Sequence, residues 1–100
     1  MADLPPISVY MEPLLHVLAE RGGRATNEEL SAAVAARVGL SDEQLRIPHG
    51  KGDRRSEFEY RLAWVRTKLK KAGDLEPDGR KAWRITDAGR ARIAAPPVSS

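Results

Sequence analysis

The chain has 100 residues, no cysteine and two histidines, and it is 41% hydrophobic and 31% charged. These values are typical of one globular domain. They exclude disulfides and thiolate metal sites, and two separated histidines do not make a zinc site. No apolar run approaches the roughly 18 residues of a membrane span, and the N-terminus lacks a signal pattern. We therefore expect a cytoplasmic protein without metal or cofactor.

Positive charge is concentrated in the middle of the sequence. The net charge is +3, but residues 1–45 sum to −4, residues 46–71 to +6 and residues 72–100 to +1. A basic segment inside a nearly balanced chain is typical of a surface that meets a polyanion, because neutralised phosphates release their counterions.

The first half of the chain predicts helices. After an irregular start, a helix is expected from about Tyr10, with Pro13 in its first turn, to the glycine pair at 22–23. Thr26 and Glu29 have capping-box spacing and predict a second helix through Arg37. The same spacing recurs in residues 41–44 and predicts a short third helix.

The segment from Ser56 to Gly73 is the strongest helix in the sequence. Ser56 and Glu59 have capping-box spacing, Gly73 is a typical stop, and no proline intervenes. A single apolar stripe at helical period runs between them, made by Phe58, Leu62, Val65, Leu69 and Ala72. One flank of this stripe carries two aromatic residues among charged ones: Glu57, Tyr60, Arg61, Trp64, Lys68 and Lys71. The opposite flank carries Glu59, Ala63, Arg66 and Lys70.

The basic loop before this helix and the hairpin after it complete the pattern. Residues 47–55 are rich in breakers and carry Lys51, Arg54 and Arg55. Past Gly73, the turn at residues 77–79 predicts a hairpin that ends in a strand at residues 82–85. Thr86 then caps a last helix to about residue 94, and residues 95–100 have the composition of a linker or tail.

The order of these elements predicts the fold class. Helices followed by a hairpin make a mainly α protein with a small β-hairpin, which is the plan of a winged helix-turn-helix. Residues 1–94 would form this domain. The helix at 56–73 would be the recognition helix, and the hairpin would be the wing, with Arg80 and Lys81 near its tip.

Four sequence runs resemble a known family. They are YMEPLLHVL, NEELSAAVAARVGLSDEQL, RLAWVRTKLKKAGDLE and AWRITDAGR, spread from residue 4 to residue 92. They are similar to the N-terminal domain of Mrr-type restriction systems, which are methylation-dependent, type IV systems. The resemblance implies a winged-helix module that binds DNA in proteins that often append a nuclease domain and cleave methylated DNA. The nuclease core is absent from these 100 residues, so no catalytic residue and no enzyme activity is expected here.

The predicted partner is double-stranded DNA, either unmodified or methylated at adenine N6 or cytosine C5. The helix-turn-helix geometry places base or methyl contacts at Ser56, Glu57, Tyr60, Arg61 and Trp64. Backbone contacts would come from Lys51, Arg54, Arg55, Lys68, Lys71, Arg80 and Lys81. An ordinary transcription regulator and a winged helix used for protein contacts remain alternatives, and the sequence leaves the oligomeric state open.

Overall fold

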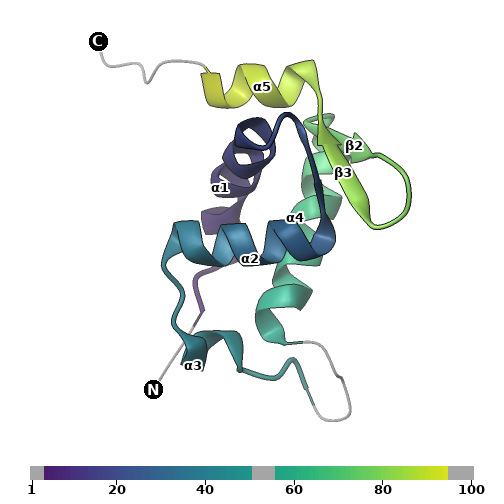
Figure 1. Ribbon diagram of the computed structural model, residues 1–100. Coiled ribbons are helices and arrows are strands. Elements are labelled where there is room, and N and C mark those ends of the chain that lie inside the picture. The colour runs from purple at the N-terminus through teal and green to yellow at the C-terminus, as the bar shows by residue number, and fades with distance from the viewer. Residues whose placement is uncertain (1–3, 51–55, 95–100) are drawn as a thin grey trace.

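A computed structural model describes residues 4–50 and 56–94, which form a mainly helical domain with one small antiparallel sheet (Figure 1). The helices are α1 (Ile7–Glu20), α2 (Asn27–Val38), α3 (Asp42–Leu45), α4 (Glu57–Ala72) and α5 (Asp87–Ala94). The strands are β1 (Arg24–Thr26), β2 (Leu75–Pro77) and β3 (Ala82–Ile85). This arrangement is compatible with the expected winged helix.

Helix α4 forms where the sequence predicted it. The apolar stripe predicted which face of the helix is buried. Its residues Phe58, Leu62, Val65 and Leu69 are all buried in the core. Helix α1 packs against both α2 and α4 and supplies Tyr10, whose ring meets Phe58 edge-on at 5.5 Å. The core therefore fixes α4 on one face and leaves the remainder of its surface to solvent.

The predicted caps are present, with one difference at α4. In α2 and α3 both halves of the capping box form, between Thr26 and Glu29 and between residues 41 and 44. In α4 the Ser56 hydroxyl accepts from the Glu59 amide, but the Glu59 side chain does not bond back to Ser56. The sequence predicted a complete box here, and only half of it forms.

The start of α1 was placed wrongly by the sequence. The helix begins at Ile7 rather than Tyr10, so Pro13 lies inside it and not in its first turn. Pro13 has no N–H to give to the carbonyl of Val9, which is an exposed residue. The missing bond therefore faces solvent, where water replaces it at little cost.

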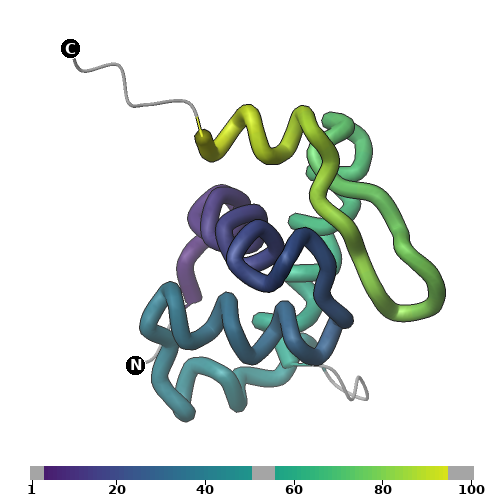
Figure 2. Tube along the Cα trace, turned by 45° about the horizontal axis from the view of Figure 1, so that its top comes forward, coloured from purple at the N-terminus to yellow at the C-terminus, as the bar shows by residue number. Residues whose placement is uncertain are grey.

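The sheet has three strands rather than the two of the predicted hairpin. Its order is β1-β3-β2, and all pairs are antiparallel. Strand β1 pairs Ala25 with Trp83, and β2 pairs Glu76 with Arg84. Figure 2 shows the β2–β3 hairpin projecting from the helices. Because β3 is bonded on both sides, the hairpin is attached to the connection between α1 and α2.

Helix α5 packs on α1, and its first turn meets the connection that follows α4 (Figure 1). Thr86 caps it as predicted, since its hydroxyl accepts from the Gly89 amide at 3.1 Å. Gly89 is buried against the carbonyl of Asp74, the residue that follows the left-handed Gly73 at the end of α4. Two predictions, the basic side chains of the 51–55 loop and the tail at 95–100, lie outside the described residues.

Candidate nucleic-acid interface

The outer face of α4, opposite its buried stripe, presents two aromatic rings. Trp64 is 45% exposed, which makes it one of two exposed large hydrophobic residues in the described part of the chain. Its ring meets that of Tyr60 edge-on, with centroids 6.5 Å apart, and the two rings line a shallow hollow with Ala63 and Thr67. Tyr60 also stacks on His49 at 3.6 Å.

On the flank nearest α1, the first turn of α4 carries a hydrogen-bonded network. The Glu57 carboxylate accepts from Arg61 Nε at 2.7 Å and lies 2.9 Å from His49 Nδ1. Arg61 also donates to the carbonyls of Leu4 and Pro5 at 3.1 and 3.0 Å. These side chains are mostly buried, with exposed fractions of 28% for Arg61 and 19% for Glu57. Arg61 thus ties the N-terminal segment to α4.

This network bears on three of the predicted base contacts. Ser56 caps the helix, while Glu57 and Arg61 hydrogen-bond within the chain. Contact with a base would require each to share or exchange an existing bond, and that role stays a prediction. No local sequence pattern indicates the bonds of Arg61 to the N-terminal segment, because those two acceptors lie more than fifty positions away.

The network predicts a pH effect on stability. Hydrogen bonds from His49 and from Arg61 lower the pKa of Glu57 below its ordinary value of 4.5. Because the pKa of Glu57 is lower in the folded state, its ionised carboxylate stabilises the folded protein above about pH 4.5. This stabilisation is lost as the pH falls through the folded-state pKa. We expect the Glu57→Gln variant to unfold more easily than the wild type at pH 7. In urea titrations at several pH values, the difference should shrink below pH 4.5; a difference independent of pH would contradict the assignment.

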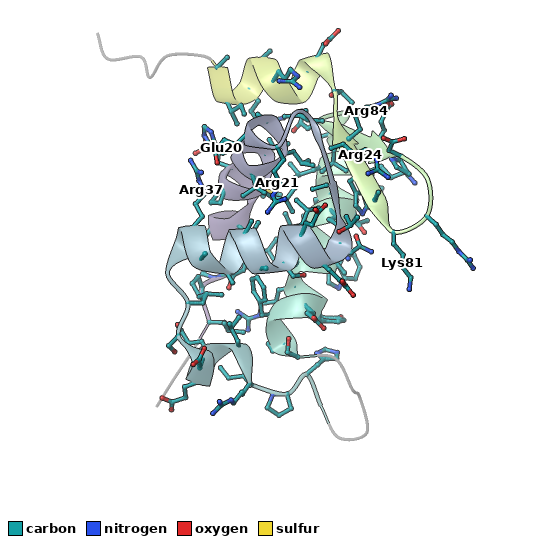
Figure 3. All side chains as sticks on the ribbon, viewed as in Figure 1. Glu20, Arg21, Arg24, Arg37, Lys81 and Arg84 are labelled. Carbon is teal, nitrogen blue, oxygen red and sulfur yellow. The ribbon has the colours of Figure 1, made fainter. Side chains whose placement is uncertain are left out.

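Six of the described arginines form ion pairs with acidic residues of the same chain. They form the pairs Arg21–Glu29, Arg24–Asp78, Arg37–Glu20, Arg61–Glu57, Arg84–Glu76 and Arg92–Asp74. Figure 3 shows Arg37 and Glu20 on one side of the molecule and Arg24 and Arg84 on the exposed side of the sheet. Their charges are locally neutralised, so they add little to any attraction for a polyanion.

The cations at the hairpin tip and those of α4 other than Arg61 differ, because none forms an ion pair with a described residue. Four are exposed and were predicted as backbone contacts: Lys68, Lys71, Arg80 and Lys81. Lys70 and the half-buried Arg66 also lack an acidic partner within 4.0 Å in the described segments. Arg46 and Arg90 also lack an ion pair with a described residue, and the other unpaired cations of the described segments lie on α4 and at the hairpin tip.

The hairpin is hydrogen-bonded to the start of α2 close to its tip. The Asn27 amide donates to the Lys81 carbonyl at 2.8 Å, and Trp83 Nε1 donates to Asn27 Oδ1 at 2.8 Å. Lys81 has a φ of 59°, a conformation that helps close the hairpin. Its side chain lines a hollow with Thr26, Asn27 and Glu28, and in Figure 3 it points away from the sheet. Trp83 is half-buried against the core, as its strand position suggested.

A second hollow continues from this one onto α4. It has a volume of about 220 Å³ and is lined by Asn27, Glu28, Ser31, Glu59, Ala63 and Arg66. Asn27 and Glu28 belong to both hollows, so one concave surface runs from the hairpin tip to α4. Partial burial lowers the pKa of Arg66, and the nearby Glu59 carboxylate opposes that shift. The flank of α4 that faces the hairpin is therefore the Glu59–Arg66 flank.

The described residues contain no cluster of three or more metal-binding side chains. None of the described helices is both long and apolar enough to cross a bilayer.

No curated protein and no solved structure matches the chain. The sequence model of the family described as the Mrr N-terminal domain matches residues 8–95, which include nearly all of the helices and strands above. In restriction-system proteins this domain is separate from the nuclease. The chain therefore belongs to the Mrr N-terminal domain family, as the four sequence runs indicated.

Proposed function

We propose that this domain is a winged helix that binds double-stranded DNA and recognises modified bases for a restriction endonuclease. Helix α4 would enter the major groove, and the β2–β3 hairpin would act as the wing. The observation that carries the proposal is the separation of the basic residues. Most arginines elsewhere pair with acids, whereas the cations of α4 other than Arg61 and those of the hairpin tip have no ion pair with a described residue, and α4 also carries the exposed Trp64.

The two kinds of side chain would have different tasks. Lys68, Lys71, Arg80 and Lys81 would contact phosphates and supply most of the affinity, together with Lys51, Arg54 and Arg55 of the loop. The rings of Tyr60 and Trp64 would contact base edges and methyl groups. One buried methyl group contributes only about 0.8 kcal/mol, so discrimination needs both rings or a poor fit to unmethylated DNA.

In this proposal, the remaining predicted base contacts position the start of α4. Ser56 sets the start of α4, and the Glu57–Arg61 pair holds that first turn against the N-terminal segment. Their bonds hold the first turn of the helix that carries Tyr60 and Trp64. The chain would thus act as a binding domain, and cleavage would belong to a nuclease domain elsewhere in the parent protein.

A binding assay with a duplex panel tests the proposal. The panel contains the same set of sequences in unmodified, hemimethylated and fully methylated form, and the methylated base is either 5-methylcytosine or N6-methyladenine. Binding to each duplex is titrated at several salt concentrations. We expect log Kd to rise by about 3.6 or more per tenfold increase in salt, since four phosphate contacts contribute about 0.9 each. We also expect tighter binding to one methylated duplex.

Two other results would count against the proposal. Steep salt dependence without any preference for a methylated duplex would support DNA binding but contradict the recognition of modified bases. No binding to any duplex at low salt would contradict DNA binding itself and favour a surface for protein contacts.

A further inference from the structure

We infer that the hollow between α2 and α4 reads the major-groove edge of C·G base pairs, with Glu59 and Arg66 as the residues that determine specificity. The inference rests on the proposed function and names the bases that this domain would prefer. It differs from the sequence-based prediction, which placed base contacts on the other flank of α4.

The first step concerns Glu59, whose carboxylate has been left free by the fold. Glu29 and Gln44 occupy the equivalent position of their helices, and each bonds back to its cap residue, at 2.9 and 2.8 Å. Glu59 follows the same spacing but does not close its box. It is exposed and lines the hollow instead. A carboxylate at such a position accepts a hydrogen bond from the exocyclic amino group of cytosine.

The second step concerns Arg66, which lies two turns further along the same flank. It is half-buried, and no described acid lies within 4.0 Å of it, although the other half-buried arginine of α4, Arg61, makes three hydrogen bonds within the chain. Burying a guanidinium without a bonded partner is costly. Two parallel hydrogen bonds to guanine O6 and N7 would supply that partner.

The third step concerns why the hollow suits cytosine and guanine better than adenine. Asparagine reads adenine with its oxygen and nitrogen together, and Asn27 is the only amide side chain lining this hollow. Its oxygen already accepts from Trp83 Nε1 at 2.8 Å. This bond uses one of the two lone pairs of the Asn27 oxygen and ties the amide to β3, whereas Glu59 and Arg66 are an acceptor and a donor without a hydrogen-bonded partner among the described residues, and they match cytosine and guanine.

Ala63 adds a place for a methyl group. It lies one turn from both Glu59 and Arg66 and lines the same hollow. The C5 position of cytosine is adjacent to the amino-bearing carbon, and alanine provides a small apolar contact for a methyl group there. The hollow therefore favours 5-methylcytosine over N6-methyladenine.

Selection from a randomised duplex library tests this inference on the whole chain. The variants are Glu59→Ala, which removes the acceptor, and Arg66→Lys, which keeps the charge but loses the bidentate geometry. Lys68→Gln, on the flank nearest α1, is the control. We expect the wild type to prefer C·G at one or more positions by about tenfold, and both variants to lose most of this preference. The control should bind every duplex more weakly and keep the preference.

Folding and the proposed function are checked separately. Thermal unfolding of each variant shows whether a lost preference reflects lost structure, and Arg66→Lys is conservative enough to remain folded. The inference is overturned, with DNA binding intact, if the wild type shows no C·G preference or if both folded variants retain it. If the wild type binds no duplex at low salt, the proposed function fails, and the inference fails with it.

Discussion

Replacing Gly89 with alanine is expected to unfold much of the domain at temperatures where the wild type is stable. A Cβ at this position would lie 2.1 Å from the carbonyl oxygen of Asp74 and 2.8 Å from a side-chain carbon of Ile85. The Asp74 oxygen is a backbone atom that also accepts from the Thr86 amide at 3.0 Å, so it cannot move without opening the junction of α4 and α5.

We expect this variant to lose about 3 kcal/mol or more of its unfolding free energy, the upper end of the cost of overpacking. For a domain of this size, the Tm should fall by more than about 10 °C. Calorimetry or thermal circular dichroism measures the shift directly.

Two other glycines serve as controls because a Cβ at either would meet nothing within 4 Å. Gly50→Ala should change the unfolding free energy by less than about 0.5 kcal/mol. Gly39 has a φ of 84°, so Gly39→Ala should cost about 1 kcal/mol through backbone strain alone. If Gly89→Ala resembled either control, the close packing of α5 on Asp74 would be refuted.

The second large effect concerns affinity for DNA. Replacing Lys68, Lys71 and Arg80 together by glutamine should weaken binding to a duplex by about a hundredfold at 0.15 M salt. The salt slope should fall by about 2.7, since three phosphate contacts are removed at about 0.9 each. Fluorescence anisotropy over a salt series measures both quantities.

A charge-matched variant separates local contacts from net charge. Arg21, Arg37 and Arg90 lie outside α4 and the hairpin, and the first two are paired with Glu29 and Glu20. Replacing these three by glutamine removes the same total charge. We expect less than a tenth of the loss in affinity. Equal losses in the two triple variants would show that the free cations of α4 and the hairpin have no special role.

Local patterns in the sequence predicted the elements that position the interface. The apolar stripe of α4, its serine cap and Gly73 together predicted one helix, and the turn at residues 77–79 predicted the hairpin. Each of these signals depends on residues close together in the chain, so helix period and turn chemistry were sufficient.

Features that depend on distant residues were missed. Strand β1 has only three residues and no alternating pattern, and it forms because β3, more than fifty positions later, offers it a partner. The bonds of Arg61 to the Leu4 and Pro5 carbonyls join segments equally far apart. The flank of α4 that faces the hairpin also could not be assigned, because helical period gives relative angles and not the neighbours on each side.

The attachment of the hairpin to α2 has a thermodynamic consequence. Strand β3 is bonded to strands on both sides, and Asn27 bonds both Lys81 and Trp83, so the hairpin stem and the start of α2 form one hydrogen-bonded unit. A ligand that docks across this unit meets groups already in their bound positions, and little conformational entropy is lost on association. Loosening the joint, for example with Asn27→Ala, should therefore make complex formation entropically more costly even though no contact atom is removed from the hairpin tip.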